Sequence, residues 1–403
     1  MTDVFATATI WLGLAILSAA LAHRLRISIA LMEICVGIMA AAAAFHFQAD
    51  NILSADAEWL RFVAATGAIL LTFLAGAELD PQSLRAKKWE VLVVGFIGFL
   101  GPFIGCAAVA RFALGWNAQA SWLAGVALST TSMAVVYAVM LETGFNRTEF
   151  GKGILGACFV NDLGTVLALG FIFAPFTYRT LIFGVVCAVA FLALPPLTRR
   201  LTELYAHRTA AIRTKWVLFL LFGLGGLALW SGSEAVLPAY IAGMVLAGDF
   251  AQDEFLMRRL RTLTVGFLTP FYFIRAGALV SVPAILSAPL IFLLLFAGKT
   301  LSKIFGLAPV IGWFRRDAKE KWYYTLMMST GLTFGTISAL YGYSHGIVSR
   351  EQYSFLVAVV IASAVIPTMI ANFAFLPRHL LPAEAAEQPE RIDTGKVAAE
   401  ENP

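Results

Sequence analysis

The chain has 403 residues, of which 60% are hydrophobic and only 13% are charged, and its formal net charge is +4 at pH 7. A soluble globular protein carries about 25% charged residues, so this composition excludes a water-soluble enzyme, a nucleic-acid-binding domain and a disordered scaffold. The sequence predicts an all-α polytopic membrane protein.

Thirteen apolar segments separated by charged breaks predict thirteen membrane spans, because a transmembrane helix needs about 20 apolar residues. They lie near residues 4–22, 27–46, 60–78, 90–113, 119–140, 150–174, 179–197, 215–231, 236–249, 264–281, 285–308, 321–343 and 354–376. We therefore expect a transmembrane domain over residues 1–376. Residues 377–403 are rich in Pro, Ala and Glu, so we expect a short disordered cytoplasmic tail there, since it has little apolar surface to bury.

The distribution of Lys and Arg predicts the topology. These residues gather in the loops that follow odd-numbered spans, for example at Arg85–Lys88, Arg199–Arg200, Arg258–Arg261 and Arg315–Lys321. Loops rich in Lys and Arg stay on the cytoplasmic side of a membrane. The pattern predicts a multi-pass protein of the cell (inner) membrane with its N-terminus outside and its C-terminus inside, and an odd number of spans requires the same arrangement.

A carboxylate lies in the middle of the sixth predicted span, where Asp162 follows Asn161 and has apolar sequence on both sides. Ionisable groups inside a membrane are costly and are typical of functional sites. A carboxylate that has lost its hydration exchanges a proton near neutral pH, and its oxygens also suit a hard cation. We predict that Asp162 binds a proton and Na⁺ or K⁺ in competition. The structural alternative is an aspartate neutralised by a buried base.

Hydroxyl residues interrupt the fifth span at Thr130, Thr131 and Ser132, and a similar run from Ser329 to Thr336 interrupts the twelfth. If residues 4–174 and 215–376 form two repeats around a separate seventh span, these interruptions fall at matching positions. Broken helices at matching positions of two repeats indicate a transporter binding site. We therefore expect the first run, together with Asn161, to line the site. Ser and Thr are also common packing residues between membrane helices.

Three cations lie within predicted spans: Arg275 in the tenth, and Lys299 and Lys303 in the eleventh. The two lysines are four residues apart and so lie on one face of a helix. We expect one of the three to compensate the charge of Asp162 when neither a proton nor a cation is bound. Arg275 keeps its charge, so it needs a permanent partner or a wet cavity.

Several segments resemble the monovalent cation:proton antiporter superfamily, in the branch with an Asn-Asp motif. They are Leu31–Gly37, Thr66–Asp80, Leu128–Val136, Leu141–Gly144, Asn161–Asp162, Tyr240–Gly248 and Pro270–Gly277. The resemblance implies a homodimer whose protomers have a core and a dimerisation domain, built around two crossing broken helices. It also implies that Asp162 carries both the cation and the proton. The neighbouring Asn161 implies electroneutral exchange, and a base of the eleventh helix is expected to face Asp162, which fits Lys299 or Lys303 equally.

The predicted function is alternating-access exchange of protons for a monovalent cation, with Na⁺ favoured. The alternative is a K⁺/H⁺ antiporter or a gated K⁺ efflux system of the same fold. The sequence contains no Walker A motif, dinucleotide fingerprint, zinc spacing or nucleophile elbow. We therefore expect no enzymatic activity and no cofactor beyond the transported ions. The expected partners are the lipid bilayer and a second copy of the chain, without nucleic acid and without a soluble regulatory domain in this chain.

Overall fold

The computed structural model describes residues 2–25, 28–47, 52–77, 87–173, 177–205, 211–233, 235–250 and 254–381. All regular secondary structure within these ranges is helical, which confirms the predicted all-α class. The first half of the chain forms α1 (Thr2–Leu25), α2 (Ile29–His46), α3 (Glu58–Ala77), α5 (Lys88–Ala108), η1 (Val109–Ala113), α6 (Ala118–Ser129), α7 (Met133–Thr143), η2 (Phe145–Arg147), α8 (Glu149–Phe173) and α9 (Tyr178–Tyr205).

The second half forms α10 (Ile212–Ser231), α11 (Val236–Phe250), α12 (Glu254–Leu263), η3 (Thr264–Leu268), α13 (Thr269–Ala278), α14 (Val282–Ser287), α15 (Pro289–Phe314), α16 (Ala318–Met327), α17 (Thr333–Ser344), α18 (Arg350–Ala374) and η4 (Arg378–Leu380). Most of the tail expected over residues 377–403 lies outside the described residues, since the description ends at residue 381.

Nine helical segments of the described chain are long and apolar enough to cross a membrane. They correspond to nine of the thirteen predicted spans. The other four predicted spans consist of shorter or interrupted helices, namely α6 with α7, α11 alone, η3 with α13, and α16 with α17. The interruptions in α6–α7 and α16–α17 fall where the hydroxyl runs predicted them.

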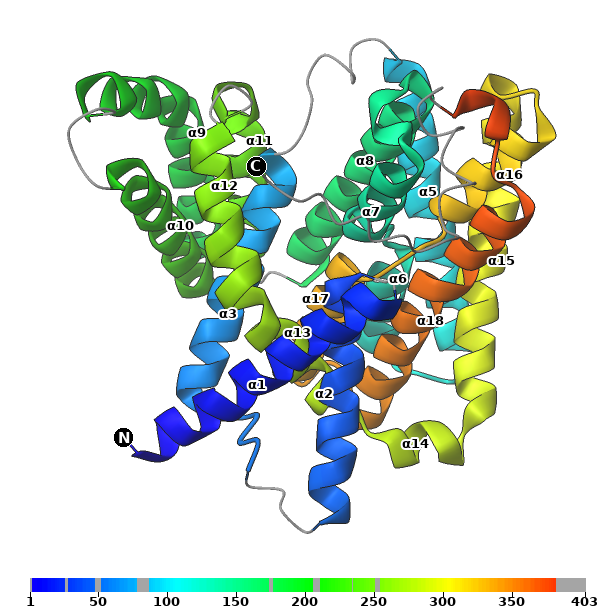
Figure 1. Cartoon of the computed structure of the whole chain (residues 1–403), viewed down its shortest axis with the longest axis horizontal. Helices are drawn as coiled ribbons and strands as arrows, with labels where there is room; N and C mark the ends of the chain where they lie inside the picture. The colour runs from blue at the N-terminus through cyan, green and yellow to red at the C-terminus, as the bar shows by residue number, and fades with distance from the viewer. Residues whose placement is uncertain are drawn as a thin grey trace, which may run out of the picture.

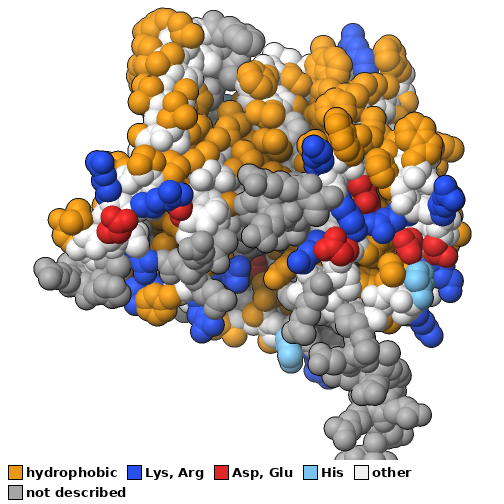
Figure 2. All heavy atoms as spheres, turned by 90° about the horizontal axis from the view of Figure 1, so that it is seen from above, with side chains coloured by type: hydrophobic (Ala, Val, Ile, Leu, Met, Phe, Trp, Pro, Cys, Tyr) orange, Lys and Arg blue, Asp and Glu red, His pale blue; other side chains and the backbone are white. Residues whose placement is uncertain are grey.

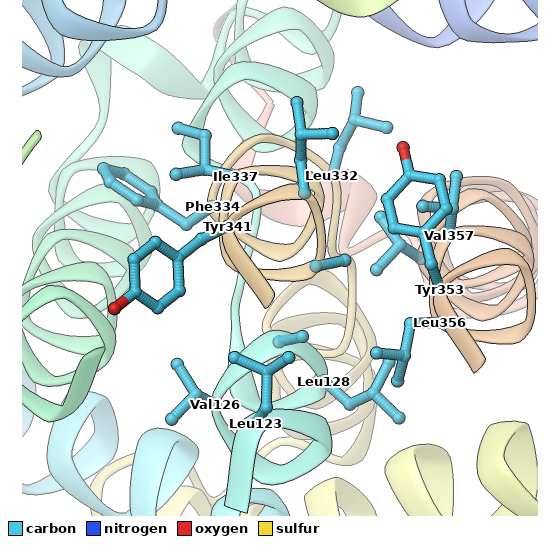
Figure 3. Close-up of a cluster of buried hydrophobic side chains, with 14 of the residues drawn as sticks. Leu123, Val126, Leu128, Leu332, Phe334, Ile337, Tyr341, Tyr353, Leu356 and Val357 are labelled. Atoms are coloured by element: carbon cyan, nitrogen blue, oxygen red, sulfur yellow. The ribbon is translucent and has the colours of Figure 1, made fainter. Parts of the chain in front are cut away.

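The helices form two groups (Figure 1). One, here called the α3 group, contains α3, α9, α10, α11 and α12, and it has an apolar core of its own. The other, the α8 group, contains α5, α6, α7, α8, α15, α16, α17 and α18. Figure 3 shows one part of its core, where side chains of α6, α17 and α18 interdigitate. Helices α1 and α2 pack on α13, which in turn contacts α3.

Close packing inside the α3 group depends on two glycines. Gly76 of α3 lies against the backbone carbonyl of Tyr240 in α11, and Gly243 of α11 lies against the carbonyl of Phe73 in α3. A Cβ atom at either glycine would overlap backbone, which no side-chain movement can relieve. Small residues allow membrane helices to approach in this way, so α11 is fixed on α3.

One end of the bundle, here called the basic end, carries the start of α5, the end of α9 and the start of α16. Figure 2 looks onto this end and shows Lys and Arg side chains spread over several helices. The ion pairs there include two that matter below: Arg315 donates to Glu90 through its Nε and Nη2 atoms, at 3.0 and 3.2 Å, and Arg199 contacts Asp249 at 2.7 Å. The opposite end carries residues 52–57, α14 and the end of α17 (Figure 1).

Candidate ion-binding site at two crossing helix breaks

The first break separates α6 from α7 at Thr130, Thr131 and Ser132. The hydroxyl of Ser129 donates to the carbonyl of Val126 at 2.9 Å, and that of Thr130 to Ala127 at 3.3 Å. Such back-bonding competes with the regular helix, and Thr130 takes an extended conformation with φ −63° and ψ 150°. The three residues are buried. Their backbone groups consequently need partners outside their own helix.

The second break separates α16 from α17 and crosses the first. The backbone N–H of Ser132 donates to the carbonyl of Thr330 at 3.1 Å, and the hydroxyl of Thr131 donates to the carbonyl of Met328 at 2.7 Å. The two breaks therefore satisfy part of each other's backbone hydrogen bonding. Irregular backbone inside a membrane is tolerated only where protein or a water-filled cavity supplies such partners.

Asn161 joins α8 to the first break. Its amide oxygen accepts from the backbone N–H of Thr131 at 2.8 Å, and its amide nitrogen donates to the carbonyl of Ser129 at 3.3 Å. One side chain thus satisfies a donor and an acceptor on the two sides of Thr130. The geometry gives Asn161 a structural task that the sequence alone did not assign.

Asp162 follows directly and is only 1% exposed. Its Oδ1 atom has no hydrogen-bond partner among the described residues. An unpartnered carboxylate oxygen buried inside a protein is costly unless it is protonated or bound to a cation. The structure therefore leaves one acceptor position of this carboxylate for a proton or an ion.

Lys299 and Lys303 of α15 are both fully buried and reach the first break. The Nζ atom of Lys303 donates to the hydroxyl oxygen of Thr131 at 2.8 Å, and the Nζ atom of Lys299 lies 3.5 Å from the carbonyl oxygen of Thr130. Within the described part of the chain, neither lysine forms an ion pair with Asp162 shorter than 4 Å. The lysines share the neighbourhood of the aspartate, but their direct partners belong to the broken helix.

Arg275 is not part of this group. Its Nε atom donates to the carbonyl of Ala55 at 2.7 Å, and its Nη2 atom lies 3.5 Å from the carboxylate of Asp56. It lines a cavity of about 540 Å³ at the end of the bundle opposite the basic end. The sequence expectation that a permanent cation needs a partner or a wet cavity fits both contacts, while compensation of Asp162 has no support in this geometry.

One residue near the site received no role from the sequence. Tyr240 of α11 is buried, and its hydroxyl donates to the carbonyl of Phe159 in α8 at 3.2 Å. Phe159 lies one helical turn before Asp162. A tyrosine in an apolar run is indistinguishable from an ordinary core residue in the sequence, so only the fold reveals this connection.

The site brings together a carboxylate oxygen with an open acceptor position, three hydroxyl residues, non-helical backbone at two helix breaks and two ammonium groups. Oxygen ligands of this kind suit a hard cation such as Na⁺. The family profile described as "Sodium/hydrogen exchanger, transmembrane" matches residues 12–375. The chain belongs to the sodium/hydrogen exchanger family. This exchanger is accordingly a multi-pass membrane protein and a secondary transporter, not an enzyme.

Relatives of this exchanger cover most of its length. It is 25% identical over 345 residues to a probable Na⁺/H⁺ antiporter 3 of Methanocaldococcus jannaschii, an alignment that covers 81% of this chain and 87% of the relative. It is 25% identical over 378 residues to a Na⁺/H⁺ antiporter of Enterococcus hirae, covering 88% and 93%. A third relative is the glutathione-regulated potassium-efflux system protein KefC of Salmonella arizonae, at 26% over 306 residues, which cover 71% of this chain and 47% of that protein.

A solved structure supports the fold of the exchanger. The sodium proton antiporter MjNhaP1 of Methanocaldococcus jannaschii superimposes with a TM-score of 0.65, covering 92% of this chain and 97% of the other. The sequence identity is 14%, so the similarity establishes the helical architecture alone.

Proposed function

We propose that the exchanger carries protons in one direction and Na⁺ in the other by alternating access around Asp162. The observation that carries the proposal is the buried Oδ1 atom of Asp162, which has no hydrogen-bond partner among the described residues. Its neighbour Asn161 bonds to the first break. The proposed polar lining of the ion-binding site consists of Thr130, Thr131, Ser132 and Asn161. The full-length similarity to Na⁺/H⁺ antiporters supports Na⁺, and the partial similarity to a potassium-efflux protein keeps K⁺ as the second candidate.

The exchange is proposed to be electroneutral, with one proton for one cation. Replacing a proton by Na⁺ on a single carboxylate moves no net charge, and Asn161 supplies no second acid. If Lys299 or Lys303 also released a proton in each cycle, a second charge would move and the exchange would respond to the membrane potential. Electroneutral and electrogenic exchange therefore differ in whether the rate responds to the membrane potential.

The assay is proton release from proteoliposomes after addition of NaCl, KCl or LiCl, with and without a clamped membrane potential. We expect Asp162→Asn to abolish the exchange while the protein remains folded. Asp249→Asn is the matched control, because Asp249 is an acid at the basic end that pairs with Arg199, and it is expected to leave the exchange intact. Full cation-dependent exchange by Asp162→Asn would refute the proposal.

We further propose that the basic end faces the cytoplasm of the cell (inner) membrane, that the chain acts as a homodimer, and that exchange serves pH homeostasis. The positive-inside distribution of Lys and Arg supports the orientation. The two breaks in the predicted fifth and twelfth spans support the division into repeats at 4–174 and 215–376. Cross-linking in native membranes tests the dimer, and labelling of cysteines placed at the two bundle ends tests the orientation.

A further inference from the structure

A cavity of about 540 Å³, here called the vestibule, opens at the end of the bundle opposite the basic end. Its walls come from α3, α10, α11 and α13 on one side and from α17 on the other. The exposed side chains of Arg61 and Asp56 belong to its lining, and Ala68, Val236 and Ile337 belong to its apolar wall. The vestibule thus lies where the α3 group faces the α8 group.

The vestibule ends before it reaches Asp162. Neither Asp162 nor Asn161 contributes to its lining. On α11 the lining includes Val236, and Tyr240 follows one helical turn deeper. On α17 it includes Ile337, and Phe334 lies one turn deeper. Figure 3 shows Phe334, Ile337 and Tyr341 on the same side of α17, away from Tyr353 and Leu356 of α18.

Three aromatic rings lie at this depth: Phe159, Tyr240 and Phe334, here called the aromatic seal. The ring of Tyr240 stacks on Phe159 with 5.4 Å between centroids and meets Phe334 edge to face at 5.6 Å. All three are buried, and the Tyr240 hydroxyl is bonded to the carbonyl of Phe159. A packed apolar layer of this kind offers water few polar partners, and water does not cross it readily.

The seal also connects the two helix groups. Phe159 and Phe334 belong to α8 and α17 of the α8 group, whereas Tyr240 belongs to α11, which is fixed on α3 by Gly76 and Gly243. A relative movement of the two groups would therefore separate Tyr240 from the other two rings. Phe159 lies one turn from Asp162, so the gap would open beside the carboxylate.

We propose that the aromatic seal is the gate between the vestibule and Asp162, and that Tyr240 is the residue whose withdrawal opens it. The gate rests on the proposed function in that Asp162 is the carrier that it shields. Tyr240 does not bind the ion in this scheme. It decides whether water and cations in the vestibule reach the carboxylate.

The experiment measures the accessibility of position 162 without any need for transport. Asp162→Cys is prepared in the full chain, alone and combined with Tyr240→Ala, and sealed vesicles are treated with a membrane-impermeant methanethiosulfonate. Ile337 lies in the vestibule wall. Labelling of Ile337→Cys therefore shows in which vesicle preparation the reagent can enter the vestibule. The corresponding proteins that retain Asp162 measure the background reaction of the four native cysteines with the reagent.

We expect Asp162→Cys to react slowly when Tyr240 is present and about tenfold faster or more with Tyr240→Ala, since a lost aromatic ring leaves a water-accessible gap. Tyr240→Phe retains all three rings and is expected to react like the parent. Tyr323→Ala is the matched control, because Tyr323 is a buried tyrosine in another aromatic cluster, beside Phe145 and Phe150, and it should leave the rate unchanged.

The proposal is overturned if Asp162→Cys reacts as fast as Ile337→Cys while Tyr240 is present. It is also overturned if Tyr240→Ala leaves position 162 unreactive although Ile337→Cys in the same background still reacts. If Tyr240→Ala fails to fold, Tyr240→Leu takes its place with the same expected direction. Failure of the proposed function is read separately, from exchange by Asp162→Asn, and does not alter the labelling result.

Discussion

The ammonium group of Lys299 lies where a side chain at Gly331 would begin. A Cβ atom added to Gly331 would overlap Lys299 Nζ and would come within 3.2 Å of both Ser363 Oγ and Thr130 Oγ1. Gly331 belongs to the second break, and Lys299 approaches the first break from α15. Because glycine has no side chain, the ammonium group of Lys299 can lie between the two crossing breaks at Gly331.

Gly331→Ala is expected to reduce exchange by about tenfold or more, because overpacking a buried site costs about 1–3 kcal/mol and here displaces a charged group. The measurement is the initial rate of Na⁺-dependent proton release from proteoliposomes. Gly226→Ala on α10 is the control, since a Cβ there meets no atom within 4 Å, and it should leave the rate unchanged. A normal rate in Gly331→Ala would contradict the assigned place of Lys299.

Thr131→Val is expected to impair both stability and exchange. The hydroxyl of Thr131 accepts from Lys303 and donates to the carbonyl of Met328, and losing a buried hydrogen bond to a charged group costs about 1.5–3 kcal/mol. Thermal unfolding in detergent and the exchange rate are the measurements. Thr336→Val is the matched control, because within the described ranges the hydroxyl of Thr336 bonds only to the carbonyl of Leu332 in the preceding turn. Equal effects of the two substitutions would show that the contact with Lys303 contributes nothing.

The Glu90–Arg315 pair is expected to stabilise the basic end of the α8 group. Arg315→Ala leaves Glu90 buried without its bidentate partner, and breaking a buried pair in this way costs about 3–5 kcal/mol. We expect the thermal midpoint in detergent to fall by roughly 5 °C or more. Arg199→Ala removes a more exposed ion pair and should change the thermal midpoint little. The double substitution Glu90→Leu with Arg315→Met should recover most of the loss, and a midpoint as low as that of Arg315→Ala would refute this account.

The start of α16 is expected to be sensitive to acid. The backbone N–H groups of Glu320 and Lys319 lower the pKa of the Asp317 carboxyl below its ordinary value of 3.8, because Asp317 caps the helix. A group whose pKa is lowered by folding contributes stability above the unfolded value, and this contribution is lost as the pH falls through the folded value. The thermal midpoint should therefore drop as the pH falls below about 4, the ordinary range of an aspartate, and Asp317→Asn should make the drop smaller. An unchanged drop would contradict the role of this carboxylate.

The spans were largely predictable because apolar length and charged breaks reflect membrane thickness directly. The exceptions have local causes. The predicted span 285–308 is displaced to Pro289–Phe314, because α14 occupies Val282–Ser287 and a proline then starts a new helix. The predicted span 179–197 continues to Tyr205, although Pro195 and Pro196 lie inside it. Glu78 and Asp80, part of a resembling segment, lie outside the described residues.

The site was predictable to the level of its residue types. Asp162 and the hydroxyl runs stand out because polar groups are rare in apolar segments. The choice between Lys299 and Lys303 depends on which atoms each ammonium reaches, and helical spacing cannot supply that. The sequence could not supply the partners of Arg275 for a similar reason, since Ala55 and Asp56 lie in a loop about 220 residues away along the chain.

The amide of Asn161 has a mechanical consequence. Because it bonds to both sides of the first break, the Asn161 side chain ties α8 to the broken helix right beside Asp162. The contacts between α8 and α11 include the stacking of Tyr240 on Phe159, the hydrogen bond from the Tyr240 hydroxyl and the packing of Leu237 against Gly170. Among the described residues, a displacement between α8 and α11 would therefore break fewer side-chain hydrogen bonds than one between α8 and the first break.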